Sequence, residues 1–152
     1  MRRRDFFVST FLAISSVVGV ARAHMPGHHP YYMHALSDLR GARWLLEHRQ
    51  GDMAVRRHED IAIQEIDAAI AEIRRAAIND GRGLHDHPPM DGGGEYGGRL
   101  HRALDVLRRV HSDVAREEDD PMTRGLRNRA VRHIDEAAHQ VEEAIRDMER
   151  HR

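Results

Sequence analysis

Residues 62–76 read AIQEIDAAIAEIRRA, and residues 130–144, which lie 68 positions further along the chain, read AVRHIDEAAHQVEEA. In both stretches apolar residues recur every three or four positions, which is the spacing of one face of an α-helix. Both stretches also carry the same Ile-Asp step, Ile66-Asp67 in the first and Ile134-Asp135 in the second. They therefore predict two long helices of related sequence.

The relation between the two stretches extends outward along the chain. Residues 35–76 match residues 103–144 without a gap at eleven positions. Helical periodicity predicts helices over 30–49, 52–79, 98–118 and 121–150, with a loop rich in Gly, Pro and His over 80–97. Pro30 and Pro121 suit the first position of a helix.

These features predict one all-α domain over 30–152. We expect an antiparallel up-down four-helix bundle, in which short turns join helices one and two and helices three and four. The constant offset indicates a duplicated helical hairpin. The alternative is chance similarity between two Ala-rich amphipathic helical pairs.

Residues 1–23 have the features of a cleaved signal peptide. A basic start is followed by an apolar run over 8–20 and by Ala21-Arg22-Ala23, and the run is too short to cross a bilayer. Arg3-Arg4-Asp5-Phe6-Phe7 resembles a twin-arginine signal, which implies export of an already folded protein. An Arg-rich general secretory signal is the alternative. Either route predicts a periplasmic or secreted bacterial protein with no transmembrane anchor in its mature chain.

The composition excludes several kinds of chemistry. The chain has no Cys, and all 24 of its basic residues are Arg. Disulfides, iron–sulfur clusters, covalent haem and lysine-based catalysis or nucleotide binding are therefore ruled out. The formal net charge of −1 offers no long-range attraction for nucleic acid. We also find no nucleophile elbow and no His-Glu-x-x-His motif, so the sequence favours a protein that is not an enzyme.

All 13 His follow residue 23, where a His-rich arm over 24–29 precedes helix one. In an up-down bundle, the start of helix one, the 80–97 loop and the start of helix three share one end. Seven His would gather there: His24, His28, His29, His34, His85, His87 and His101. Because imidazole binds Cu, Zn and Ni, we predict a transition-metal site at this end. The alternative is that these side chains are simply solvated.

Two charged residues also repeat at the 68-residue offset. Asp67 and Asp135 each lie beside an apolar stripe, and Arg40 and Arg108 occupy matching places in helices one and three. We expect the ion pairs Asp67–Arg40 and Asp135–Arg108 to hold each hairpin together.

Three motifs carry a resemblance over most of the chain after residue 23: HALSDLR at 34–40, IDAAI at 66–70 and His87-Pro-Pro. They resemble a group of small, exported, helical bacterial proteins of no assigned function, so the resemblance implies no activity. The chain is also similar in size and composition to periplasmic stress chaperones, but it lacks their Leu-Thr-x-x-Gln motif. We therefore expect an exported bundle that binds a transition metal. The alternative is an envelope-stress or chaperone-like module that binds other proteins.

Overall fold

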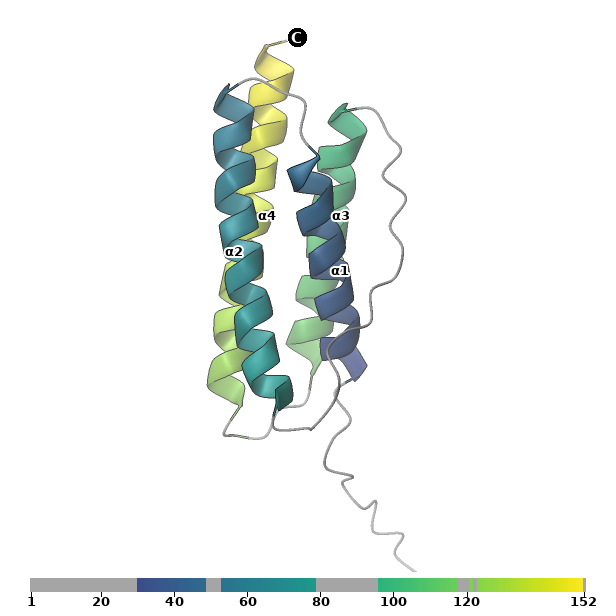
Figure 1. The fold of residues 1–152 in the computed structure, drawn as a ribbon, viewed down its shortest axis with the longest axis vertical. Helices are drawn as coiled ribbons and strands as arrows, with labels where there is room; N and C mark the ends of the chain where they lie inside the picture. Colours follow the sequence, from purple (N-terminus) through teal and green to yellow (C-terminus); the bar gives the residue numbers. More distant parts are fainter. Residues whose placement is uncertain (1–29, 49–52, 79–95, 118–120, 122, 152) are drawn as a thin grey trace, which may run out of the picture.

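The computed structural model describes residues 30–48, 53–78, 96–117, 121 and 123–151. These residues form α1 (Pro30–Glu47), α2 (Met53–Ile78), α3 (Tyr96–Arg116) and α4 (Arg124–Arg150), and no strand occurs among them. The four helices lie side by side along one axis (Figure 1). The predicted all-α four-helix bundle is therefore confirmed.

The helix boundaries differ from the prediction mainly at α4. This helix begins at Arg124 because the amides of Leu126 and Arg127 both donate to the carbonyl oxygen of Thr123, at 2.9 and 3.1 Å. Pro121 lies in the preceding turn, so its predicted place in the first helical turn is wrong. The predicted signal peptide over 1–23, the arm over 24–29 and residues 80–95 of the predicted loop lie outside the described residues.

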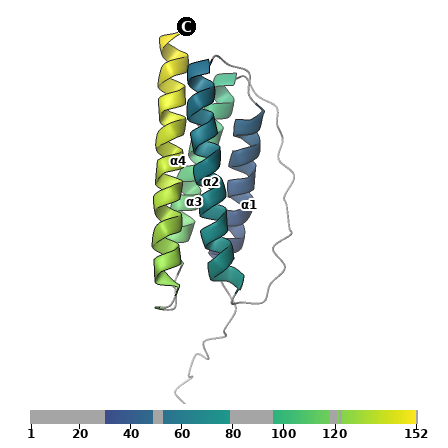
Figure 2. The ribbon, with the colours of Figure 1, turned by 60° about the vertical axis from the view of Figure 1, so that its left-hand side comes forward.

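Every helix packs against two neighbours. Around the bundle the order is α1, α2, α4, α3, so that α1 and α4 occupy one diagonal and α2 and α3 the other (Figure 2). Pairs of facing residues show the directions: Asp38 of α1 lies 3.3 Å from Arg109 of α3, and Tyr32 near the start of α1 contacts Glu117 just after α3. All four neighbouring pairs of helices are antiparallel.

The predicted up-down-up-down order is therefore wrong for α3. The start of α3 lies at the same end of the bundle as the end of α1, so α2 and α3 run in the same direction (Figure 1). Chain length permits this crossover. The 17 residues between α2 and α3 can span up to about 56 Å when extended, whereas the 21-residue α3 is about 32 Å long.

The two hairpins are buried in the same way. Each of the following pairs, 68 residues apart, has both members completely buried: Ala35 and Ala103, Leu39 and Leu107, Ala62 and Ala130, Ile66 and Ile134, Ala69 and Ala137. Glu65 and His133 are also 68 residues apart, and they contact each other. Equivalent residues meet only near a symmetry axis, so the hairpins are related by an approximate two-fold axis perpendicular to the bundle.

We predict that Ile66→Ala and Ile134→Ala destabilise the protein by similar amounts, about 2–5 kcal/mol each, because each leaves a cavity at an equivalent core position. Urea unfolding followed by circular dichroism measures the change. Met53→Ala serves as the control, since Met53 is 84% exposed and its loss should change the free energy of unfolding by less than about 0.5 kcal/mol. A large effect at only one of the two Ile positions would contradict the symmetric core.

Candidate functional site

The structure separates the two predicted metal ligands that it describes. His34 lies near the start of α1 and His101 near the start of α3, and both are exposed. Because α1 and α3 are antiparallel, these two His lie at opposite ends of the bundle. The prediction that all seven His share one end is therefore wrong for His101, which lies at the end where α4 finishes. The other five, His24, His28, His29, His85 and His87, lie outside the described residues.

No group of three or more His, Asp or Glu side chains within the described ranges could hold a metal ion. Several His there contact carboxylate or amide oxygens of other side chains instead. His133 Nδ1 lies 2.6 Å from Glu65 Oε2, and His58 Nδ1 lies 2.7 Å from Gln140 Oε1. Both contacts join α2 to α4, so these rings bridge the two helices.

The seam between α2 and α4 also holds two carboxylates with altered acidity. Glu72 lies 3.1 Å from Arg129 and 2.8 Å from Arg75. The hydrogen bond and charge of Arg129 lower the pKa of Glu72, against the opposing effect of burial. Arg150 likewise lowers the pKa of Asp147, whose carboxylate also lies 3.5 Å from His58. Both acids therefore stay ionised at neutral pH and bind cationic side chains.

The repeated Asp residues contact side chains that lie one helical turn beyond the predicted partners. Asp67 accepts a hydrogen bond from Arg43 at 2.9 Å, and Asp135 lies 3.5 Å from His111. Positions 43 and 111 are again 68 residues apart, so the pairing is repeated although its members differ from the prediction. The antiparallel register brings position 43 level with Asp67.

The two Arg predicted for these pairs lie elsewhere. Arg108 contacts Glu142 at 3.0 Å, further along the same α3–α4 face. Burial and the nearby charge of Arg74 lower the pKa of Arg40. Position 74 is the counterpart of Glu142, so the first hairpin brings two cations together where the second has an ion pair.

A buried ion pair, absent from the sequence prediction, joins α2 to α3 across the bundle. The guanidinium of Arg99 lies 2.7 Å from Glu59, and these side chains are 7% and 0% exposed. Arg99 also donates to the carbonyl oxygen of Leu45 in the last turn of α1. The sequence does contain a signal for Glu59, because it falls on the apolar stripe of Val55, Ala62 and Ile66 at helical spacing.

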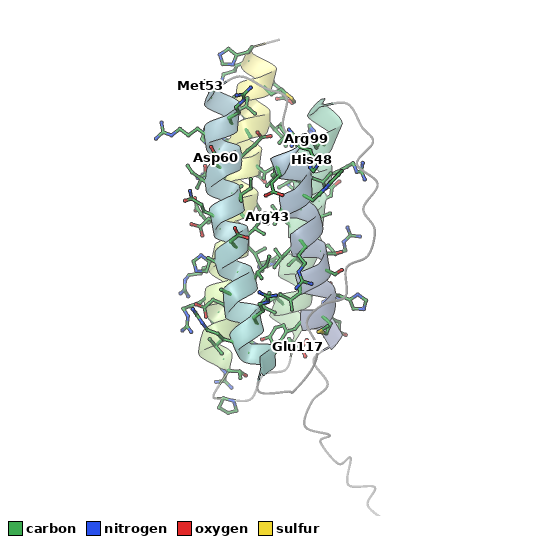
Figure 3. All side chains as sticks on the ribbon, in the orientation of Figure 1. Arg43, His48, Met53, Asp60, Arg99 and Glu117 are labelled. Carbon is green, nitrogen blue, oxygen red and sulfur yellow. The ribbon has the colours of Figure 1, made fainter. Side chains whose placement is uncertain are left out.

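A second buried acid lies at the opposite end of α1, and Figure 3 shows Arg99 and Glu117 near opposite ends of the bundle. The backbone amide of Tyr32 in the first turn of α1 donates to Glu117 Oε2 at 3.2 Å. Glu117 is 4% exposed. Amides in the first helical turn have no partner within their own helix and carry partial positive charge, so the carboxylate caps α1 from outside.

A surface hollow lies between α3 and α4. Its volume is about 190 Å³, and its lining residues are Leu107, Arg108, His111, Ile134, Asp135 and Ala138. Leu107 and Ile134 are completely buried and form an apolar floor. His111 and Asp135 at the rim are 43% and 60% exposed, so the hollow combines apolar surface with accessible polar groups.

Comparison with known proteins finds no relative of this chain. No family model, curated protein or solved structure matches the chain. None of the helices that the structure describes has both the length and the apolar character needed to cross a membrane.

We predict that Arg99→Met destabilises the protein by about 3–5 kcal/mol, because it leaves the Glu59 carboxylate buried without its guanidinium partner. The double variant Glu59→Leu/Arg99→Met should recover most of this loss. Arg108→Met is the control, since the exposed pair with Glu142 should contribute at most about 1 kcal/mol. Chemical denaturation of all three variants measures these differences. Equal costs for Arg99→Met and Arg108→Met would show that the buried pair has no special role.

We predict a pH-dependent effect of Glu72→Gln. A carboxylate whose pKa is lowered by folding stabilises the protein above the pKa of the unfolded chain, about 4.3 for Glu, and this stabilisation is lost as the pH falls through the folded value. Glu72→Gln should therefore lower the melting temperature more at pH 7 than at pH 3. Glu149→Gln, on the exposed side of α4, is the control. An effect of Glu72→Gln that is equal at both pH values would exclude ionisation of Glu72 as its cause.

Proposed function

We propose that this protein is an exported, non-enzymatic helical bundle that binds a Cu, Zn or Ni ion through His residues at the end where α1 starts and α2 finishes. The observation that supports the proposal is the antiparallel pairing of α1 with α2, held by the Arg43–Asp67 ion pair. This pairing brings Pro30 and Ile78 to one end of the bundle (Figure 1).

The two His-containing segments of the sequence join the bundle at these two residues. His24, His28 and His29 precede Pro30 by no more than six positions, and His85 and His87 follow Ile78 by seven and nine positions. His34 is exposed near the start of α1. The proposed ligands are therefore drawn from these six His, and His101 is no longer included because it lies at the other end.

Imidazole ligands suit Cu, Zn and Ni, and the absence of Cys leaves nitrogen and oxygen donors as the main ligands. Met25, Met33 and Met90 lie close in sequence to the same His residues and add thioether donors that favour Cu(I). The signal-like residues 1–23 support the proposed export to the periplasm or out of the cell, with twin-arginine translocation as the proposed route.

A chaperone-like role in binding other proteins is the alternative proposal. Large exposed apolar side chains within the described ranges are Tyr31 and Met53, near the starts of α1 and α2 at opposite ends of the bundle. They do not form one continuous apolar surface, which is the feature that would favour this alternative.

We expect calorimetric titration of Cu(II), Zn(II) and Ni(II) into tag-free protein beginning at His24 to show sub-micromolar binding of at least one metal. A ligand that binds only the folded state at 100 times its dissociation constant stabilises it by about 2.7 kcal/mol, so the melting temperature should rise. The variants His28→Ala/His29→Ala and His85→Ala/His87→Ala should each weaken binding at least tenfold.

His101→Ala is the matched control, because it removes an exposed His from the opposite end and should leave the affinity unchanged. Weak binding without a rise in melting temperature, or binding that depends on His101, would disprove the proposed site. In that case, binding of a hydrophobic dye would test the alternative role in protein binding.

A further inference from the structure

The two hairpins differ at two of the six residues that line the hollow between α3 and α4. Four of its six lining residues have an identical counterpart 68 positions earlier: Leu107, Arg108, Ile134 and Asp135 correspond to Leu39, Arg40, Ile66 and Asp67. The other two differ, since Ala138 corresponds to Ile70 and His111 to Arg43.

The first difference, Ala138 in place of Ile70, puts a smaller side chain in the lining of the hollow. Ile70 is partly buried and packs against the core of the bundle. Ala138 is also partly buried against the core, but its single methyl group leaves the space between α3 and α4 unfilled. An isoleucine side chain is therefore accommodated at the equivalent position of α2.

The second difference, His111 in place of Arg43, changes the polar groups at the rim of the hollow. Arg43 reaches Asp67 with a hydrogen bond of 2.9 Å, whereas the shorter His111 stays 3.5 Å from Asp135. Arg108 lines the same hollow from one turn away along α3. The lining therefore contains two nitrogen-bearing side chains of α3, His111 and Arg108, and Arg108 also contacts Glu142 of α4 at 3.0 Å.

We propose that the α3–α4 hollow binds a small carboxylic acid with a branched aliphatic tail. The tail replaces the missing Ile side chain over Leu107, Ile134 and Ala138, and the carboxylate accepts hydrogen bonds from His111 and Arg108. The volume of about 190 Å³ suits a ligand of this size and is smaller than the 300–1,000 Å³ of pockets for drug-sized molecules. The proposal is independent of metal binding, which concerns the end of the bundle.

The test is a titration of the full-length chain with 3-methylbutanoate, followed by the methyl NMR signals of Leu107, Ile134 and Ala138. We expect saturable shifts with a dissociation constant on the order of 1 mM, in keeping with a ligand of few atoms. Acetate, which lacks the tail, and 3-methylbutan-1-amine, which reverses the charge, should each bind at least tenfold more weakly.

Two variants distinguish the hollow from the remaining surface. Ala138→Ile fills the hollow as Ile70 does in the first hairpin, so it should abolish the shifts while keeping or raising the melting temperature. Ala71→Ile, the same substitution on α2 away from the hollow, should leave binding unchanged. Ala138→Val provides a second, smaller filling if Ala138→Ile lowers the melting temperature.

His111→Gln and Arg108→Gln test the contacts with the carboxylate, and each should weaken binding of 3-methylbutanoate several-fold. The proposal is overturned if 3-methylbutanoate gives no saturable shift, or if its binding survives in both Ala138→Ile and Ala138→Val. Equal binding of the acid and the amine would likewise disprove recognition of the carboxylate.

Discussion

The direction of α3 depends on the contacts that the guanidinium of Arg99 makes with α2 and α1. This guanidinium neutralises the buried carboxylate of Glu59 and donates to the Leu45 carbonyl at the end of α1, while Glu117, beyond the far end of α3, accepts from the Tyr32 amide at the start of α1. α1 has no acidic residue in its first turn and no basic residue in its last turn. Charges next to α3 therefore complement the partial charges at both ends of α1, and a reversed α3 would bring each charge to the wrong end.

This direction produces the approximate two-fold symmetry of the bundle. With α3 antiparallel to α1 and α4 antiparallel to α2, the two hairpins bury equivalent positions, and Glu65 meets its counterpart His133 near the axis. Two positions that differ between the symmetric hairpins lie in the lining of the α3–α4 hollow. Arg43 against His111 and Ile70 against Ala138 are the differences among the residues that line the hollow of the second hairpin. The proposed ligand site is therefore placed where the two hairpins differ, and not where they are alike.

The bundle also determines which His residues can act together. His58 and His133 contact side chains of the neighbouring helix and bridge α2 to α4. His34 and His101 are exposed at opposite ends, so a site that used both would need ligands from more than one region. The proposed metal site relies instead on two segments that join the bundle at Pro30 and Ile78. In this arrangement the folded helices supply the anchoring points, and the sequence next to them supplies the donor atoms.

The sequence by itself determined the number of helices, their approximate limits and the buried face of each, because helical periodicity depends only on the spacing of apolar residues. It also revealed the 68-residue offset that relates Ile66 to Ile134 in the core. Only the tertiary structure decided the direction of α3, the partners of Asp67 and Asp135, and the burial of Glu59. Periodicity identifies the face that a helix buries but not the neighbour that covers it, and a 17-residue connection can return α3 in either direction. The contacts between hairpins make that choice, and they exist only once the chain has folded.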